Sequence, residues 1–145
     1  MHELANLHPA AALSLAKWHE MVAKVDMTDL RSIVHPEATV RSPATFSPYK
    51  GADVVVLALS TVMPLFSDLV YQRQAATVDG FSAILEFSAK IGDKELNGTD
   101  LIRFHADGRI LDFEVIVRPL NAVQALSEEM GKRVGDRLPA YKVKV

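Results

Sequence analysis

The sequence contains no cysteine among its 145 residues, which excludes disulfides, thiol nucleophiles and cysteine-based metal sites. It also lacks a long hydrophobic run. The longest, from Val54 to Leu59, is far shorter than the roughly 20 apolar residues of a membrane-spanning helix. The N-terminus has no charged region followed by an apolar stretch, which is the pattern of a secretion signal. We therefore expect a cytoplasmic protein without a membrane partner.

Net charge is nearly absent as well. Sixteen Lys and Arg side chains oppose eighteen Asp and Glu, so the formal charge is −2 and no positive field is available to hold a nucleic acid. The seven glycines form neither a phosphate-binding loop nor a dinucleotide fingerprint, and there is no Gly-x-Ser-x-Gly nucleophile motif. We expect no nucleic-acid partner and no cofactor.

The composition that remains is that of a globular domain. Apolar residue types make up 49% of the chain and charged types 23%, close to the average of soluble domains. A chain of this length can bury one hydrophobic core, and neither a repeat nor a linker divides it. We expect a single domain over residues 1–131 and a C-terminal tail over residues 132–145, where basic residues mix with Gly and Pro.

Hydrophobic periodicity predicts helices mainly in the first half of the chain. Leu15, Trp18 and Val22 recur at the three- and four-residue spacing of one helical face. Thr28 is the expected N-cap of a second, short helix, and Pro36 is expected to stop it. The predicted helices cover residues 9–25, 28–34, 53–66 and 120–130.

The pattern changes period in the second half. Residues from Phe81 to Ala89 send alternate side chains to an apolar and a more polar face, as in a half-buried strand. Short turns such as Asp79-Gly80 and Asp107-Gly108 make consecutive strands antiparallel neighbours. The predicted strands cover residues 38–42, 69–78, 81–91, 96–105 and 109–118.

Three segments follow this order of elements with a recognisable spacing over residues 10–130. They are Asp29-Leu30 to Ala38-Thr39-Val40, Tyr49-Lys50-Gly51 to Leu65-Phe66-Ser67-Asp68, and Thr99-Asp100-Leu101-Ile102-Arg103-Phe104 followed by Asp107-Gly108-Arg109-Ile110. Together they resemble the nuclear transport factor 2-like superfamily, which includes SnoaL-like polyketide cyclases and ketosteroid isomerases. The resemblance implies an α+β fold of the cystatin-like α+β barrel type, in which a cone-shaped, curved antiparallel sheet wraps around the N-terminal helices. It also implies a mostly apolar cavity inside the cone and a homodimer formed through the outer sheet face.

Asp100 is the single acid on the sheet face that we expect the helices to cover. Because side chains alternate along a strand, Asp100 shares its face with Gly98, Ile102 and Phe104. An acid in apolar surroundings loses hydration and either stays protonated or gains a partner, and such a group is a functional candidate. The alternatives are a structural hydrogen bond to a backbone donor or to Trp18 Nε1, and a strand register that leaves Asp100 exposed.

The same alternation predicts the walls of a ligand pocket. In the last strand Leu111, Phe113, Val115 and Val117 share the inward face. Plain core packing is the alternative role of every residue in this set. With Asp100 as the catalytic candidate, the expected pocket consists of Trp18, Phe46, Tyr49, Met63, Phe66, Ile102, Phe104, Phe113, Val115 and Val117.

Similarity to ketosteroid isomerases narrows the role of Asp100. The resemblance places Asp100 where those enzymes keep a neutral acid that hydrogen-bonds the developing enolate. It places Trp18 where they keep a tyrosine donor and Ser42 where they keep the aspartate base. A serine hydroxyl has no useful basicity at neutral pH unless another group activates it. We therefore reject a standard ketosteroid isomerase, and the proton-abstracting base is unidentified.

The histidines indicate no metal site. His19-Glu20 begins like the His-Glu-x-x-His zinc motif, but Ala23 stands where the second histidine is needed, and the other histidines show no ligand spacing. His35 would suit a base near pH 7 if its loop brought it to the cavity mouth, whereas a histidine before a proline at a helix end is commonly an exposed cap.

These observations predict a small, cofactor-independent enzyme of the SnoaL-like group: an isomerase, cyclase, hydratase or hydrolase. Its substrate would be a compact hydrophobic carbonyl compound, and Asp100 would act as acid or hydrogen-bond donor. Since Ser42 provides no base, a non-catalytic module that holds a hydrophobic ligand in the same cavity is the alternative. A dimeric protein adaptor would need an exposed apolar patch, and the charged outward strand positions argue against one.

Overall fold

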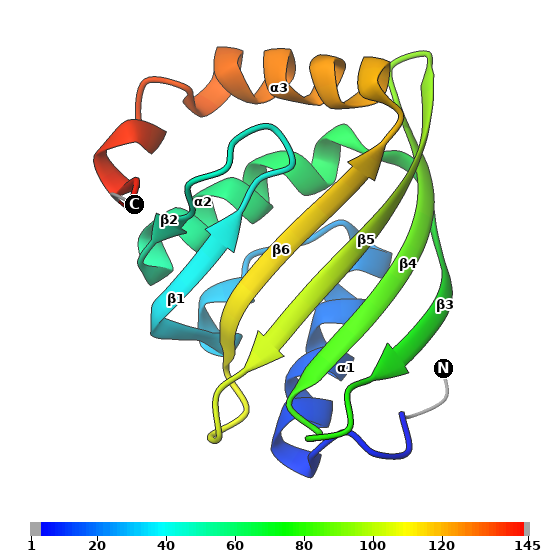
Figure 1. The fold of residues 1–145 in the computed structure, drawn as a ribbon, viewed down its shortest axis with the longest axis vertical. Coiled ribbons are helices and arrows are strands. Elements are labelled where there is room, and N and C mark those ends of the chain that lie inside the picture. Colours follow the sequence, from blue (N-terminus) through cyan, green and yellow to red (C-terminus); the bar gives the residue numbers. More distant parts are fainter. Residues whose placement is uncertain (1–3, 144–145) are drawn as a thin grey trace.

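A curved six-stranded sheet crossed by helices dominates the computed structural model, which describes residues 4–143 (Figure 1). The α-helices are α1 (Pro9–Lys24), α2 (Ala52–Val62) and α3 (Leu120–Val134), and the 3₁₀ turns are η1 (Leu30–Ile33), η2 (Met63–Leu65) and η3 (Leu138–Tyr141). The strands are β1 (Val34–Arg41), β2 (Tyr49–Lys50), β3 (Ser67–Ala76), β4 (Ser82–Ile91), β5 (Lys94–Phe104) and β6 (Ile110–Arg118).

The strand order is β2-β1-β6-β5-β4-β3. All neighbours are antiparallel except β1 and β6, which run parallel. In Figure 1 helices α1 and α2 lie behind the sheet and α3 crosses its upper end. Strands β3 to β6 form the meander that their short turns predict, and β3 is an edge strand paired only with β4. The arrangement confirms the predicted curved α+β fold.

The start of α1 is tied to the turn between β3 and β4. The His8 side chain caps the helix by accepting a hydrogen bond from the Ala10 amide. The His8 amide donates to the Gly80 carbonyl oxygen at 2.8 Å, and the Asn6 side-chain amide donates to the Thr77 carbonyl oxygen at 2.8 Å. The helix therefore begins at a fixed point of the sheet.

The two faces of β5 agree with the predicted alternation, since Gly98, Asp100, Ile102 and Phe104 are all buried. In β6 the prediction was wrong at Leu111, which is only half-buried, whereas its neighbour Ile110 is fully buried. Phe104 pairs with Ile110 although Arg103 pairs with Asp112, so Leu111 is an extra residue in a β-bulge. A bulge shifts the alternation by one position.

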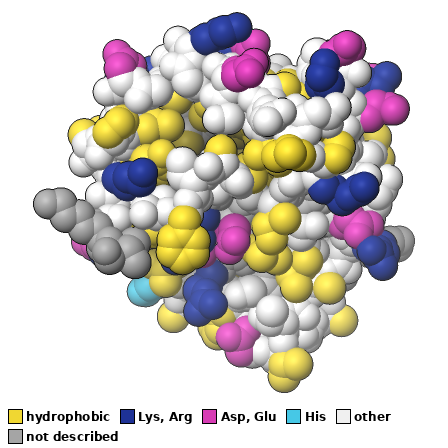
Figure 2. All heavy atoms as spheres, turned by 45° about the horizontal axis from the view of Figure 1, so that its top comes forward, with side chains coloured by type: hydrophobic (Ala, Val, Ile, Leu, Met, Phe, Trp, Pro, Cys, Tyr) yellow, Lys and Arg dark blue, Asp and Glu magenta, His cyan; other side chains and the backbone are white. Residues whose placement is uncertain are grey.

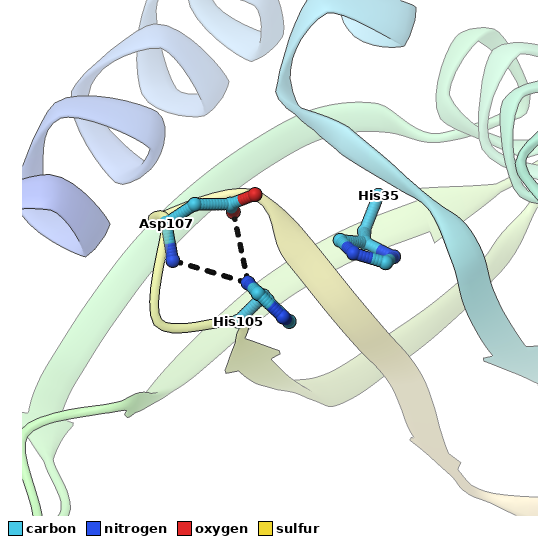
Figure 3. A group of neighbouring side chains, drawn as sticks. All are labelled: His35, His105 and Asp107. Atoms are coloured by element: carbon cyan, nitrogen blue, oxygen red, sulfur yellow. Dashed lines mark hydrogen bonds and ion pairs between the residues drawn. The ribbon is translucent and has the colours of Figure 1, made fainter.

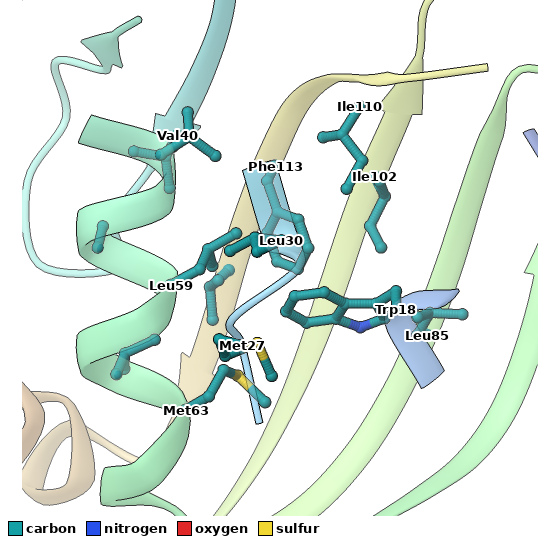
Figure 4. Packing of buried hydrophobic residues seen from close by; sticks show 14 of the residues in the cluster. Trp18, Met27, Leu30, Val40, Leu59, Met63, Leu85, Ile102, Ile110 and Phe113 are labelled. Carbon is teal, nitrogen blue, oxygen red and sulfur yellow. The ribbon is translucent and has the colours of Figure 1, made fainter. Parts of the chain in front are cut away.

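The centre of the fold is filled by large side chains from the helices and the sheet (Figure 4). Trp18 is fully buried, and its ring lies 4.9 Å from that of Phe113. Met27 and Met63 also point into this region, beside Leu59 of α2. The helices and the sheet therefore share one hydrophobic core.

The second predicted helix is only the 3₁₀ turn η1. Thr28 does not cap it; its amide and hydroxyl both bond to the Asp26 carboxylate instead. Strand β1 begins earlier than predicted and runs through Pro36. Its pairing with β6 is irregular between Val34 and Thr39, so Pro36, which has no amide hydrogen, occupies a stretch where the regular ladder is interrupted.

The C-terminal residues up to position 143 pack against the domain. Helix α3 was predicted to end near Gly131, but it continues to Val134, whose side chain is buried. Turn η3 follows, and Lys142 forms a bridge with Tyr49. The segment that we predicted to be a tail thus holds a further helical turn and joins the β2 edge of the sheet up to that position.

No helix among the described residues is long and apolar enough to cross a membrane.

Candidate functional site

Asp100 lies in the middle of β5 between Leu85 of β4 and Val115 of β6, and only 4% of its surface is exposed. Its carboxylate is not left without a partner. The Tyr71 hydroxyl donates to Asp100 Oδ2 at 2.8 Å, and Trp18 Nε1 donates to the Tyr71 oxygen at 3.0 Å. A hydrogen-bond chain thus runs from α1 through β3 to β5.

Burial controls the electrostatics of this chain. Loss of hydration raises the pKa of Asp100 to about 7, against the opposing effect of the Tyr71 hydrogen bond. Burial, followed by the neighbouring Asp100 charge, raises the pKa of Tyr71 well above its ordinary value. Tyr71 therefore stays protonated, and Asp100 exchanges a proton near neutral pH.

The sequence analysis missed Tyr71. The partners considered for Asp100 were a backbone donor and Trp18 Nε1, and the structure inserts the tyrosine hydroxyl between Trp18 and the acid. One signal was available, because Tyr71 shares with Leu69 the alternation of the predicted strand over residues 69–78. Sequence alone does not say that this edge strand reaches Asp100, which lies two strands away in the sheet.

A second polar pair lies beside Tyr71. His19 of α1 is buried, and its Nε2 lies 3.0 Å from Gln74 Oε1 of β3. The His19 ring stands edge-on to the Tyr71 ring at a centroid distance of 5.0 Å. Burial lowers the pKa of His19 below 6.5, and the hydrogen bond to Gln74 partly offsets that effect. The imidazole is therefore neutral at pH 7.

These groups border a hollow of about 490 Å³, which we call the α1–β3 cleft. Its volume falls within the roughly 300–1,000 Å³ of small-molecule sites. Val25 and Asp68, at the ends of its two walls, have φ values of 50° and 54°, and such backbone strain in residues other than glycine is concentrated at functional sites. The cleft is lined by His19, Val22, Ala23, Val25, Met27, Met63, Phe66, Asp68, Leu69, Tyr71 and Gln74.

A second hollow of about 220 Å³ lies between α2 and α3 and is called the α2–α3 cavity here. Its walls are mostly apolar side chains from β1, β6 and the two helices, and Leu138 and Pro139 of η3 close one side. Ser42 and Thr45 supply hydroxyls, and Thr45 Oγ1 is buried without a hydrogen-bond partner among the described residues. Asp100 is not part of the lining of either hollow.

Sequence comparison places this architecture in a family. The family profile of the SnoaL-like domain matches residues 15–113. The chain belongs to the SnoaL-like family.

Solved structures agree with that placement. A steroid delta-isomerase from Pseudomonas aeruginosa is 50% identical to this SnoaL-like protein, with a TM-score of 0.88 over 94% of this chain and 98% of its own. A protein from Silicibacter pomeroyi described as having a cystatin-like fold is 32% identical, with a TM-score of 0.81 over 94% of each chain. An NTF2-like protein of unknown function from Mesorhizobium loti is 18% identical, with a TM-score of 0.66 over 78% of this chain and 98% of its own, and supports the fold alone. Comparison with curated protein sequences finds no significant match.

The residues predicted to line a pocket in this SnoaL-like protein are divided among four environments. Trp18, Ile102, Phe104, Phe113 and Val117 are packed in the core, Tyr49 and Val115 line the α2–α3 cavity, and Met63 and Phe66 line the α1–β3 cleft. Phe46 is 89% exposed, because the loop before β2 turns its neighbour Thr45 towards the cavity instead. The structure therefore does not gather the predicted set around one hollow.

A cluster of His35, His105 and Asp107 lies near the turn that precedes β6 (Figure 3). Its potential ligand atoms lie within 4.8 Å of one another. However, the two rings stack at 4.4 Å, and each Nδ1 accepts a backbone amide hydrogen, from Glu37 at 3.0 Å and from Asp107 at 3.1 Å. A hydrogen bond from Arg109 also lowers the pKa of Asp107 to about 2. Stacked rings direct their lone pairs in parallel and not at one point, so we interpret the cluster as packing at a turn.

Proposed function

We propose that this SnoaL-like protein is a small-molecule enzyme of the isomerase type, which acts on a compact carbonyl compound in the α1–β3 cleft. The observation that carries the proposal is the hydrogen-bond chain from Trp18 through Tyr71 to Asp100, since Tyr71 lines that cleft. In this arrangement Asp100 acts as an acid through Tyr71 and does not itself touch the ligand. The 50% identity to a protein described as a steroid delta-isomerase supports isomerase-type chemistry.

The protonation states suggest how the chain would act. When Asp100 carries its proton, it donates to the Tyr71 oxygen, which also accepts from Trp18 Nε1. The Tyr71 hydrogen is then free for a ligand carbonyl. Donors held at the oxygen where negative charge develops contribute about 10²–10³-fold to a rate. Tyr71, supported by Asp100, would stabilise an enolate in this way.

The lining of the cleft limits the ligand. None of the described residues that line it is Lys or Arg, and Asp68 adds a carboxylate at its margin. A phosphate or carboxylate group would meet no opposite charge there. Met63, Phe66 and Leu69 provide apolar surface. A neutral, partly apolar ketone fits this environment best.

The proposal is tested with 3-cyclohexen-1-one, whose conversion to the conjugated 2-cyclohexen-1-one is followed by ultraviolet absorbance. We expect catalysis above the buffer rate, and losses of about 10²-fold in Tyr71→Phe and Asp100→Ala. Asp100→Asn should retain more activity than Asp100→Ala, because an amide can still donate to the Tyr71 oxygen. Tyr141→Phe and Asp93→Asn, which change the same residue types at positions that do not line the α1–β3 cleft, should match the wild type. Full turnover in both Asp100 variants would rule out the role given to Asp100.

A non-catalytic ligand-binding module is the second candidate. The apolar α2–α3 cavity favours it, because Ser42 lines that cavity without providing a base. Such a module would bind an apolar dye such as N-phenyl-1-naphthylamine, return every ketone unchanged after long incubation, and lose the dye when Ala58→Phe fills the cavity. Dye binding unaffected by Ala58→Phe would argue against this cavity as the site.

We also propose that two copies of the chain associate through the outer face of the sheet. Ile84 and Ile116 are 37% and 48% exposed there. On the intervening strand β5, Leu101 pairs with Ile84 and Thr99 pairs with Ile116. Figure 2 shows exposed hydrophobic side chains among charged ones on a face that includes part of this sheet surface. A partner copy would cover this apolar surface.

A further inference from the structure

Proton abstraction in the α1–β3 cleft requires a base, and the chain of Trp18, Tyr71 and Asp100 supplies only donors. Ser42 lies in the other hollow and has no useful basicity. The titratable side chains that line the cleft are His19, Asp68 and Tyr71. Tyr71 stays protonated, and Asp68 is exposed to solvent at the margin. His19 is the remaining group of suitable chemistry.

The contacts of His19 define which nitrogen is available. Gln74 Oε1 is an acceptor, so the pair at 3.0 Å assigns the ring hydrogen to Nε2 and leaves the lone pair on Nδ1. Nδ1 has no hydrogen-bond partner among residues 4–143, and it is not among their buried atoms that lack one. The basic nitrogen is therefore accessible, while Gln74 holds the opposite side of the ring.

We propose that His19 is the catalytic base of the α1–β3 cleft and that Gln74 is its positioning residue. This inference rests on the function proposed above and names the group which that function leaves open. Its substrate class is a neutral ketone with a hydrogen on the carbon next to the carbonyl.

The step balances within the cleft. His19 Nδ1 takes a proton from the α-carbon, and the C–H electron pair forms the C=C bond of an enolate. The carbonyl π pair moves to oxygen, which accepts the hydrogen bond from Tyr71. The imidazolium then returns its proton to the α-carbon or to a conjugated carbon. No oxidant, reductant or second substrate takes part.

The surroundings of His19 favour the neutral base at physiological pH. Burial lowers its pKa below 6.5. The ionisable groups facing it from β3 and β5 are Tyr71, with Asp100 behind it, and Asp68 at the cleft margin. On α1 itself the adjacent Glu20 is paired with Lys24 and exposed. The rate of proton abstraction should therefore fall as the pH drops through the pKa of folded His19. It should also fall as the pH rises through about 7, because ionised Asp100 then takes the Tyr71 hydrogen bond that the ligand needs.

The test measures exchange of the α-hydrogens of cyclohexanone in D₂O by proton NMR with the full chain. We expect exchange above the buffer rate in the wild type and a loss of about 100-fold in His19→Gln, since a positioned base contributes roughly 10²–10⁴-fold. His105→Gln, a matched change in the turn cluster, should exchange at the wild-type rate. An equal rate in folded His19→Gln would overturn the proposal.

The role of Gln74 has its own readout in the nitrogen NMR spectrum of the imidazole. The wild type should show hydrogen on Nε2, whereas Gln74→Leu should show mixed tautomers, a lower His19 pKa and slower exchange. Gln74→Glu should restore hydrogen on Nε2, because a carboxylate also accepts. A wild-type signal with hydrogen on Nδ1 would overturn the assignment of the basic nitrogen.

The two proposals fail in different ways. Exchange that depends on Tyr71 and Asp100 but not on His19 overturns the inference and leaves the proposed function standing. Exchange that depends on His19 but not on Asp100 overturns the role proposed for Asp100 and leaves His19 standing as the base. If the wild type exchanges no α-hydrogen, both proposals are overturned.

Discussion

At the scale of single residues, Asp100 combines an acidic side chain with an interior that excludes water. The unfolded chain releases its proton near pH 3.8, whereas the folded protein holds it up to about pH 7. The resulting stabilisation is complete below pH 3.8 and is lost as the pH rises through 7. Burial therefore lets Asp100 act as an acid near neutral pH, and it also makes the ionised form of Asp100 unfavourable in the folded protein.

This property predicts the pH dependence of stability in Asp100→Asn. Because asparagine does not ionise, the variant should gain stability relative to the wild type as the pH rises from 4 to 8. The gain should reach a few kcal/mol, with about 4 kcal/mol as an upper bound for a pKa shift of this size. Urea unfolding of both proteins across that pH range measures it, with Asp93→Asn as the control. A difference that stays constant with pH would show that Asp100 titrates normally. The opposite dependence contributed by His19 is common to both proteins and cancels.

The sequence anticipated some of these residues and missed others. Alternation along β5 placed Asp100 on the buried face, because a central strand in a regular ladder keeps its period of two. Tyr71 and Gln74 lie on β3, whose pairing with β4 shifts register between Ser67 and Val70 and again between Tyr71 and Gln74. His19 was judged only as a failed zinc motif, since its contacts depend on which strand α1 packs against.

At the scale of elements, β4 and β5 are fitted to each other around Gly98. Gly98 pairs with Phe87, and a Cβ at Gly98 would overlap the Phe87 ring. Glycine is therefore required here because a Cβ would not fit. Its φ angle, which other residues can also adopt, is not the reason. By contrast, a Cβ on Gly131 inside α3 would meet nothing within 4 Å.

These two positions predict opposite effects of one substitution. Gly98→Ala should lower the free energy of unfolding by about 1–3 kcal/mol, because overpacking forces Phe87 to move. Gly131→Ala should raise it by roughly 0.5–1 kcal/mol, because alanine favours the helix more than glycine does. Thermal unfolding of the two variants beside the wild type decides the matter. Equal effects of the same sign would mean that Phe87 does not lie over Gly98.

How well the sequence predicted an element depended on whether local sequence or tertiary packing stabilises it. Helix α1 has a clear apolar face and a defined start, and its predicted range over residues 9–25 differs by one residue from Pro9–Lys24. The end of α3 was misplaced because Gly131 reads as a stop signal, whereas the burial of Val134 holds one more turn. Tertiary packing, which a single sequence does not display, decided that case.

At the scale of the whole molecule, the proposed association through the outer sheet face predicts an oligomer that one charge can break. Ile116→Glu should shift the protein from dimer to monomer in size-exclusion chromatography with light scattering, because it places a charge in an apolar contact. Val78→Glu changes a fully exposed residue outside the strands and should leave the dimer intact. A wild-type protein that stays monomeric at every concentration would exclude the association.

The position of β3 at the edge of the sheet has a consequence for how the protein can change. One wall of the α1–β3 cleft is carried by a strand whose outer side has no neighbour in the sheet, and several of its residues are exposed. Substitutions at the exposed Asp68 therefore alter the cleft without disturbing the packing around Trp18 and Phe113. Ligand preference and fold stability are largely separable here. Evolution or laboratory selection can therefore diversify this margin while the remainder of the chain stays constant.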